Sequence, residues 1–171
     1  YLPLSHVAEQ LFSVHNNVVV GATIWFAESL DTLADALRAA RPHHFLAVPR
    51  VWEKMQAKME AVGAKNSPVK KKIAAWARKV GLAAGYAEQE GRPRPITYGL
   101  ANKLVFSKVR ANLGLERART LITGAAPISR RTLEFFLSLG LPIYEVYGMS
   151  ESTAATTVSH AGRYRTGKAG Y

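Results

Sequence analysis

Apolar residues along the chain occur at two spacings, one typical of buried strands and the other of amphipathic helices. Short runs of β-branched and aromatic residues predict strands over residues 18–26, 45–48, 120–123 and 142–147. Apolar residues three or four positions apart predict helices over residues 5–12, 30–40 and 97–112, and three more that begin at Pro49, Pro68 and Ser129. Strands that alternate with helices in this way indicate an α/β domain.

The same pattern predicts which side chains of three helices face the core. After Pro49 the inner stripe comprises Trp52, Met55, Met59 and Val62. After Pro68 it comprises Val69, Ile73, Trp76 and Val80. After Ser129 it comprises Leu133, Phe136 and Leu137. Because residues three and four apart share a helix face, we expect each set to be buried.

Helical crossovers between strands predict a mostly parallel sheet with helices on both faces. In such sheets, ligands bind beyond the carboxyl ends of the strands. Two predicted strands end in short polar or side-chain-poor segments, which are Gly124-Ala125-Ala126-Pro127 and Tyr147-Gly148-Met149-Ser150-Glu151. We expect these two segments to meet at one edge of the sheet.

Each of the motif residues has a common structural explanation when it is taken alone. Gly124 suits a turn, Tyr147 a core position near a strand end, and Ser150 a helix N-cap. Glu151 suits the first turn of a helix, where the dipole favours an acid. Together they provide bare backbone, an aromatic plate, a hydroxyl and a carboxylate, which are the groups needed to hold a nucleotide and Mg²⁺.

Composition excludes several other classes of protein. The 171 residues are 48% hydrophobic and include no cysteine, so the chain is globular and has neither disulfides nor thiolate metal sites. No apolar run approaches the roughly 20 residues of a membrane span. Residues 1–9 carry no basic segment typical of a signal peptide. No Walker-type loop, no Ser-His-Asp arrangement and no transition-metal motif around His6, His43 or His44 can be assembled.

Positive charge is concentrated in one stretch. The formal net charge is +11, and residues 61–87 contain six basic residues and no acidic one. A solvated helical face is the favoured interpretation. The alternative is a surface for phosphates, acidic lipid headgroups or nucleic acid. A nucleic-acid-binding module needs aromatic residues on an exposed face, and Trp76 is predicted to be buried, so no nucleic acid is expected as a partner.

The motif of residues 147–151 resembles the Tyr-Gly-x-Thr/Ser-Glu motif of the acyl-adenylate-forming superfamily, and residues 124–127 resemble its adenine loop. Residues 2–7, Leu-Pro-Leu-Ser-His-Val, are similar to the upstream Pro-x-x-His segment. Residues 21–27 and the sequence Val-Pro-Arg-Val-Trp-Glu-Lys at 48–54 are similar to the long-chain acyl-CoA synthetase branch, including its bubblegum type. The resemblance covers the whole chain.

The resemblance implies a role for each candidate residue. Adenine would stack between Tyr147 and the backbone of residues 124–126, with Glu145, Val146, Gly148 and Met149 completing the cofactor site around Ala125, Ala126 and Pro127. Ser150 would bind phosphate and Glu151 would bind Mg²⁺. His6 would border the place where the fatty carboxylate meets the α-phosphate, and Trp25 would lie near the acyl tunnel. Some relatives carry an aromatic gate four residues after the His; here Gln10 stands there.

The implied activity has two steps, in which ATP activates a fatty carboxylate to an acyl-adenylate and CoA then takes the acyl group. The chain begins and ends abruptly at Tyr1 and Tyr171, so residues 1–171 are interpreted as an internal piece of the large N-terminal domain. The phosphate loop would lie upstream, and the ribose-binding Asp, the catalytic Lys and the C-terminal lid domain downstream. We therefore expect this piece to be inactive alone, and an exposed sheet edge to favour self-association.

Two alternatives stay open from the residues alone. One is an acyl-AMP ligase that passes the acyl group to a carrier protein or another acceptor, because acceptor choice depends on absent parts. The other, more distant, is a basic nucleic-acid-binding module. We expect a cytoplasmic location, since the absence of cysteine fits a reducing compartment. The Lys70–Lys72 helix offers a surface for peripheral membrane contact.

Overall fold

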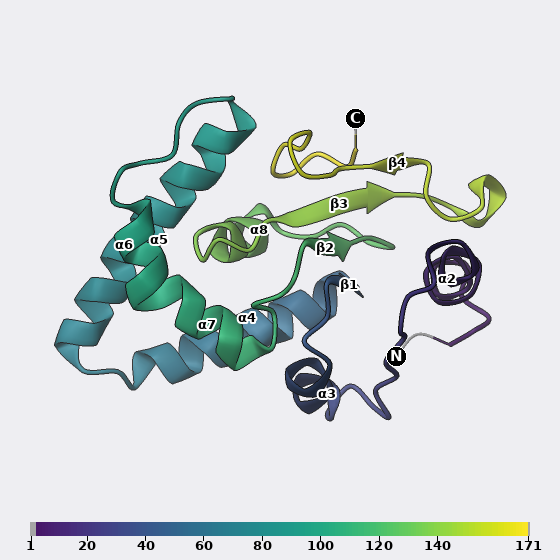
Figure 1. Ribbon diagram of the computed structural model, residues 1–171, viewed down its shortest axis with the longest axis horizontal. Coiled ribbons are helices and arrows are strands. Elements are labelled where there is room, and N and C mark those ends of the chain that lie inside the picture. Colours follow the sequence, from purple (N-terminus) through teal and green to yellow (C-terminus); the bar gives the residue numbers. More distant parts are fainter. Residues whose placement is uncertain (1–2, 171) are drawn as a thin grey trace.

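The computed structural model describes residues 3–170 as one four-stranded sheet with helices packed around it (Figure 1). The strands lie in the order β1 (His44–Ala47), β2 (Thr120–Thr123), β3 (Ile143–Tyr147) and β4 (Thr157–Val158). The first three are parallel, and β4 runs antiparallel to β3. The predicted α/β fold with a mostly parallel sheet is therefore confirmed. The two chain ends at Tyr1, Leu2 and Tyr171 lie outside the described residues.

Long helical connections allow the strands to run parallel. Between β1 and β2 the chain forms α4 (Pro49–Ala64), α5 (Pro68–Gln89), α6 (Tyr98–Ala101), the π-helical η2 (Asn102–Phe106) and α7 (Ser107–Leu113). α3 (Leu33–Ala40) precedes β1, and α8 (Arg130–Leu137) joins β2 to β3. α8 begins at the predicted place, where the Ser129 hydroxyl accepts a hydrogen bond from the Thr132 N–H at 3.1 Å and so caps the helix.

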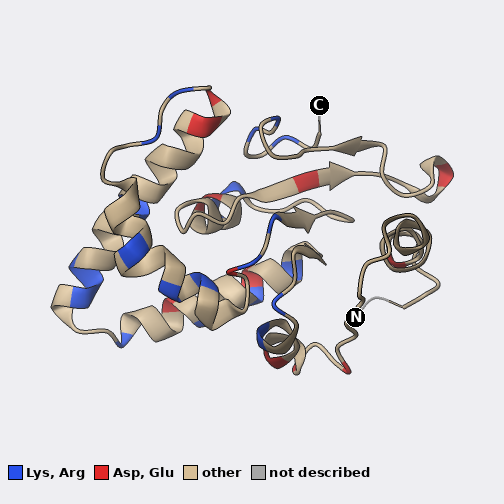
Figure 2. Ribbon diagram, viewed as in Figure 1, with Lys and Arg blue, Asp and Glu red and all other residues tan. Residues whose placement is uncertain are grey.

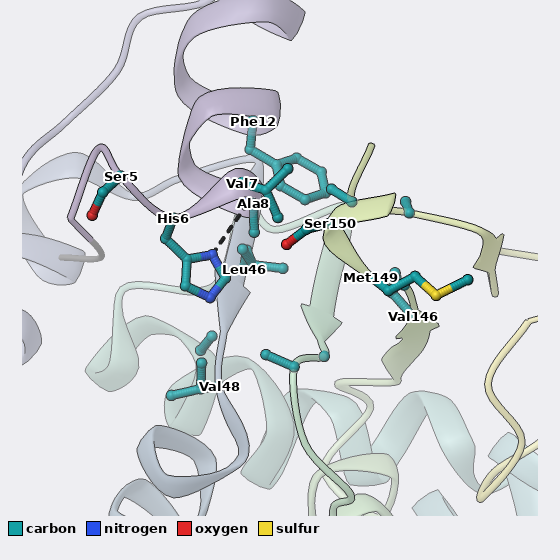
Figure 3. Close-up of a pocket in the computed structure, with 16 residues that line it drawn as sticks. Ser5, His6, Val7, Ala8, Phe12, Leu46, Val48, Val146, Met149 and Ser150 are labelled. Atoms are coloured by element: carbon teal, nitrogen blue, oxygen red, sulfur yellow. Dashed lines mark hydrogen bonds between the residues drawn. The ribbon is translucent and has the colours of Figure 1, made fainter. Parts of the chain in front are cut away.

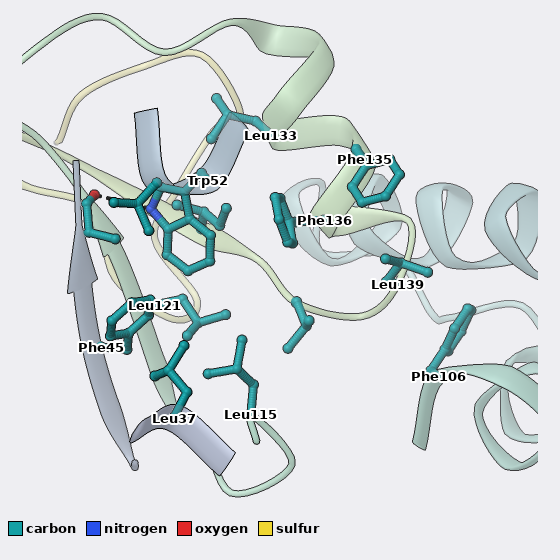
Figure 4. Packing of buried hydrophobic residues seen from close by; sticks show 14 of the residues in the cluster. Leu37, Phe45, Trp52, Phe106, Leu115, Leu121, Leu133, Phe135, Phe136 and Leu139 are labelled. Atoms are coloured by element: carbon teal, nitrogen blue, oxygen red, sulfur yellow. Dashed lines mark hydrogen bonds between the residues drawn. The ribbon is translucent and has the colours of Figure 1, made fainter. Parts of the chain in front are cut away.

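The main core lies between one face of the sheet and the helices α4 and α8 (Figure 4). The parallel register places Phe45, Leu121 and Ile143 side by side on this face. The fully buried Trp52 of α4 packs edge-on against Phe45 and against Phe136 of α8, with ring centroids 5.3 and 5.1 Å apart. This cluster fixes the carboxyl ends of the strands relative to one another.

The predicted strand over residues 18–26 is wrong. The chain instead forms α1 (Val7–Glu9), the π-helical η1 (Gln10–His15) and α2 (Asn16–Val20), which ends at Gly21 in the left-handed conformation. Residues 21–27 belong to no helix or strand. A strand requires a neighbouring strand for its backbone hydrogen bonds, whereas a helix satisfies them internally. The run of valines therefore forms a helix, with Val18 and Val19 mostly exposed.

The predicted inner stripes of α4 and α5 are partly wrong as well. Val62 is exposed at the end of α4, and α5 exposes Val69, Ile73 and Trp76 to 67%, 41% and 36%. α5 buries small residues instead, namely Ala77, Gly81, Ala84, Gly85 and Ala87. A Cβ atom on Gly81 would overlap the Ser138 carbonyl, so α5 approaches the end of α8 too closely for larger side chains.

Two short elements follow β3 that the sequence pattern did not predict. The 3₁₀ turn η3 (Ser150–Ser152) comes directly after the strand, and the chain then returns as β4. The Thr156 N–H donates to the Tyr147 carbonyl at 2.9 Å at the start of this pairing. The turn between β3 and β4 is therefore held at both ends and stands at the carboxyl edge of the sheet.

Candidate functional site

A cavity of about 370 Å³ lies beyond the carboxyl ends of β1, β2 and β3 (Figure 3). Residues from four segments that are far apart in the sequence line it: 5–8 and 12 near the N-terminus, 46–48 at the end of β1, 124–125 after β2, and 146, 148–150 and 154–155 at and after the end of β3. The structure thus brings the two motif segments together with His6 at one edge of the sheet.

The loop after β2 approaches β3 through its glycine. A Cβ atom on Gly124 would lie 3.1 Å from the Val146 carbonyl oxygen, which is tighter than an ordinary contact. The next residue, Ala125, has a φ of 68°, a left-handed conformation that residues with a side chain seldom adopt. The loop therefore exposes backbone at the cavity wall at some conformational cost, a feature that is common at binding sites.

The turn after β3 is even more constrained. A Cβ atom on Gly148 would overlap the carbonyl of Ala154, so only glycine fits there. Thr153 and Ala154 have left-handed φ values of 58° and 82°, and the Ala154 N–H donates to the Met149 carbonyl at 3.1 Å. Of the four described residues other than glycine with a left-handed φ, three thus lie in segments that line the cavity. Figure 3 shows the Ser150 hydroxyl turned toward the cavity.

His6 stands at the opposite wall. Its Nδ1 accepts a hydrogen bond from the Ala8 N–H at 3.2 Å, so the imidazole caps α1 (Figure 3). In a neutral ring an accepting Nδ1 places the proton on Nε2. The imidazole is therefore oriented, half-buried, with an N–H available on the ring edge away from its cap. Phe12, one and a half turns later, contributes an apolar side chain to the same wall.

Two motif residues lie outside the cavity itself. The Tyr147 side chain is 53% exposed and does not line the cavity, although its neighbours Val146 and Gly148 do. Glu151, the residue that follows Ser150, is exposed, and within residues 3–170 its carboxylate forms no ion pair. Both residues are exposed to solvent and adjoin residues that line the cavity, namely Val146 and Gly148 for Tyr147 and Ser150 for Glu151.

Glu145 does not line the cavity. Its carboxylate accepts a hydrogen bond from the Gly167 N–H at 2.7 Å, which ties β3 to the C-terminal segment. Burial raises the pKa of Glu145, and the backbone N–H groups of Gly167 and Lys168 oppose that shift. Its role in the geometry is thus to hold residues 165–168 beside the strand.

Four further predicted residues do not line the cavity. Ala126 and Pro127 are exposed beyond the bend. The Gln10 amide donates to the Leu4 carbonyl at 2.9 Å, and Trp25 is mostly exposed. Trp25 belongs to the segment without helix or strand, so no regular element fixes it against the cavity.

Several lining residues were missed by sequence reasoning. They are Ser5, Val7, Ala8, Phe12, Leu46, Ala47, Val48, Ala154 and Ala155. The end of β1 could have been found, because parallel strands all direct their carboxyl ends to the same edge. The sequence pattern did not identify Phe12, Ala154 and Ala155 as lining residues. Phe12 is positioned by the α1–η1 helix, and Ala154 and Ala155 by a turn that the pattern did not predict.

The donor set limits what metal the site could hold. Within the described part of the chain, no group of three or more His, Cys, Asp or Glu residues is placed to bind a metal ion. A single carboxylate such as that of Glu151 fits Mg²⁺, which proteins often hold by one or two carboxylates plus the phosphates of a substrate.

Comparison with known proteins gives a consistent result. The family described as "AMP-binding enzyme" matches residues 1–171. The chain is similar to a long-chain-fatty-acid–CoA ligase, ACSBG2, of Xenopus laevis, with 51% identity over 169 residues that make up 96% of the chain and 23% of that protein. Similarity extends to the proteins of the same name from Gallus gallus (50% identity, 93% of the chain and 21% of the protein) and Homo sapiens (40%, 96% and 25%). The chain spans about a quarter of the length of these curated relatives.

Proposed function

This chain belongs to the family of AMP-binding enzymes, and we propose that it forms the nucleotide-binding part of a long-chain fatty acid–CoA ligase. The observation that carries the proposal is the cavity that joins His6, the bend at 124–125 and the turn at 148–150 at one sheet edge. The names of the relatives support the choice of a fatty acid and CoA as substrates. Residues 1–171 then represent part of a larger adenylate-forming domain.

Adenine is proposed to lie at the rim of the cavity, between the Tyr147 ring and the backbone of residues 124–126. The 53% exposure of Tyr147 supports this placement, because an accessible aromatic ring can stack on a base. Backbone N–H and C=O groups at the Gly124 bend supply hydrogen-bonding partners for the edge of the base. Glu145 supports the site indirectly, because its carboxylate holds β3 and the segment around Gly167 together.

The phosphates are proposed to lie along the turn after β3. Ser150 donates its hydroxyl to a phosphate oxygen, and the backbone at Gly148 and Met149 follows the chain of phosphates. Glu151 would hold Mg²⁺ together with those phosphate oxygens, and the ion would neutralise charge on the departing pyrophosphate. The protein's own contribution is to fix these donors before the reaction begins.

The fatty carboxylate is proposed to enter from the side of His6. A carboxylate oxygen attacks the α-phosphorus of ATP, the bond to pyrophosphate breaks, and the acyl-adenylate forms. The CoA thiol then attacks the acyl carbon, and AMP leaves. We propose that His6 Nε2–H donates to an oxygen of the substrate, and that Phe12, Gln10 and the segment of Trp25 border the acyl chain.

The first test measures binding of a fluorescent ATP or AMP analogue with Mg²⁺. We expect Tyr147→Ala to weaken binding about fivefold to a hundredfold, the value of one base-stacking contact, and Tyr147→Phe to retain it. Ser150→Ala and Glu151→Gln should weaken ATP binding more than adenosine binding. Matched controls away from the cavity are Ser107→Ala and Glu53→Gln. Failure of the unmodified chain to bind any adenine nucleotide contradicts the proposal.

The second test concerns turnover. Pyrophosphate release with ATP, Mg²⁺ and palmitate should be absent from the 171-residue chain, because the phosphate loop and the catalytic Lys that the family resemblance implies are expected outside it. Pyrophosphate release by these residues alone contradicts that prediction. In the longer protein that contains them, acyl transfer to CoA supports the ligase, and transfer to a carrier protein supports the sibling acyl-AMP ligase.

A further inference from the structure

The N-terminal half of α5 presents an apolar stripe to the outside of the molecule. Val69, Ile73 and Trp76 are four and three residues apart, so they lie on one face of the helix, and all three are exposed. Val69 is the most exposed of the three and Ile73 and Trp76 are partly exposed, because α5 turns its glycine and alanine side toward α6, η2 and α8. An exposed cluster of aliphatic residues and tryptophan on a rigid helix is a typical interaction surface.

Lysines flank the stripe on both sides. On a helical projection Lys72 and Lys79 lie along one border and Lys70 along the other, while Lys65 occupies the preceding turn. Within the described residues none of these four lysines forms an ion pair. Figure 2 shows Lys and Arg spread over the corner where α4 meets α5. The sequence from 61 to 87 contains no acidic residue that could neutralise them.

We infer that this face of α5 docks on an anionic lipid surface. The arrangement of apolar residues and tryptophan between lysines is that of a helix lying in a membrane interface, where the apolar side chains enter the acyl boundary and the lysines meet headgroups. Within residues 3–170 no helix is long and apolar enough to cross a bilayer. Because the stripe lies on a folded helix, its backbone needs little further ordering when it binds.

Lipid is favoured over nucleic acid by the chemistry of the stripe. Single-stranded nucleic acids are bound by several aromatic residues for base stacking, and here Trp76 is the single aromatic residue among aliphatic ones. Phosphates alone would not use Val69 and Ile73, whereas a bilayer uses both the cations and the apolar side chains. The inference is independent of the proposed enzyme activity, because binding is measured without ATP or fatty acid.

The test is co-sedimentation of the 171-residue chain with vesicles of phosphatidylcholine alone or with added phosphatidylserine. We expect binding to the anionic vesicles, weakened by salt, and little binding to the neutral ones. Ile73→Ser with Trp76→Ser should reduce the affinity more than about tenfold. Lys70→Glu with Lys72→Glu should reduce it at least about tenfold, since each lysine near an anionic surface is worth about fivefold.

Matched controls carry the same chemical changes elsewhere. Ile96→Ser removes a fully exposed aliphatic side chain beyond the far end of α5, and Arg165→Glu with Lys168→Glu makes the same change in charge on the C-terminal segment. Circular dichroism should show that every variant stays folded. In a Trp25→Phe background, vesicles should shift the emission of Trp76 to the blue, because Trp52 is already buried.

Three results overturn the inference. One is absence of binding, or equal binding to neutral and anionic vesicles. Another is unchanged affinity of the α5 variants, or equal loss in the controls. The third is tight binding of a labelled oligonucleotide that the α5 substitutions abolish while vesicles are not bound, which assigns the face to nucleic acid instead.

Discussion

Helices α8 and α5 both carry large apolar residues at helical spacing, but α8 buries these residues and α5 leaves them partly exposed. α8 buries its large side chains, and Leu133, Phe136 and Leu137 are all at most 3% exposed. α5 buries alanine and glycine and leaves Ile73 and Trp76 outside. The difference arises because α8 packs on the sheet, where large side chains fill the space, whereas α5 packs closely on another helix and admits only small ones.

This contrast shows that an apolar stripe predicts burial only where a partner surface is available. At Gly81 and Gly85 the backbone of α5 comes so near to Ser138 and Leu137 that Cβ atoms would overlap them. The contact direction of α5 was therefore decided by its small residues. Its large apolar residues therefore lie away from this contact, and we propose that they contact a lipid surface.

The largest expected effect is at the core of α8. Phe136→Ala should lower the free energy of unfolding by about 3–5 kcal/mol, because it leaves a cavity beside Trp52 and Phe135. Urea denaturation followed by circular dichroism measures this loss. Phe26→Ala, which truncates a mostly exposed ring, is the control and should change stability little. Equal losses at both positions contradict the assignment of the core.

The second prediction concerns the close approach of α5. Gly81→Ala should destabilise the fold by about 1–3 kcal/mol, although alanine is the better helix former, because its Cβ meets the backbone of Ser138 and the Phe106 ring. Gly63→Ala in α4 is the matched control, since nothing lies within 4 Å of a Cβ there. It should stabilise the protein by up to about 1 kcal/mol. Stabilisation by both substitutions would mean that α5 and α8 are not in close contact.

The third prediction uses a polar link between the two helices. The Tyr86 hydroxyl donates to the Glu134 carboxylate at 2.5 Å, and this hydrogen bond lowers the pKa of Glu134. Tyr86→Phe should reduce stability by about 1 kcal/mol near neutral pH. A carboxyl with a lowered pKa contributes stability above its unfolded pKa of about 4.3 and loses it as the pH falls through the folded value.

The difference in stability between Tyr86→Phe and the unmodified chain should therefore shrink below about pH 4. Denaturation at several pH values measures this, and Tyr98→Phe, which lacks a carboxylate hydrogen bond, should show no such convergence. A difference that does not change with pH would show that the hydroxyl stabilises the fold by packing alone.

The smallest expected effect is on the exposed stripe. Val69→Ser should change the free energy of unfolding by no more than about 0.5 kcal/mol, because Val69 is 67% exposed and is not part of the core. The same denaturation experiment as for Phe136→Ala gives the comparison directly. A loss of several kcal/mol would mean that the stripe of α5 is buried in solution, and the contrast between the two helices would disappear.

Much of the site could be predicted from the sequence. The segments at 124–127 and 147–151 each follow a strand, and the rule for parallel sheets was enough to place them at one edge. The left-handed turn at 153–154 and the contribution of Phe12 could not be predicted, since neither depends on periodicity. Trp25 does not line the cavity, because residues 21–27 are irregular instead of part of the expected strand. Gln10 does not line it either, and its amide donates to the Leu4 carbonyl.

The sequence by itself determined the alternation of three parallel strands with helices, because periodicity, Pro at helix starts and Gly at helix ends are local signals. It also determined the groups available at the carboxyl edge. Only the tertiary structure decided which face of α5 is buried and whether Val18–Val20 pair as a strand. Those outcomes depend on the distance to a neighbouring backbone and on the presence of a hydrogen-bonding partner, and neither is encoded within the segment itself.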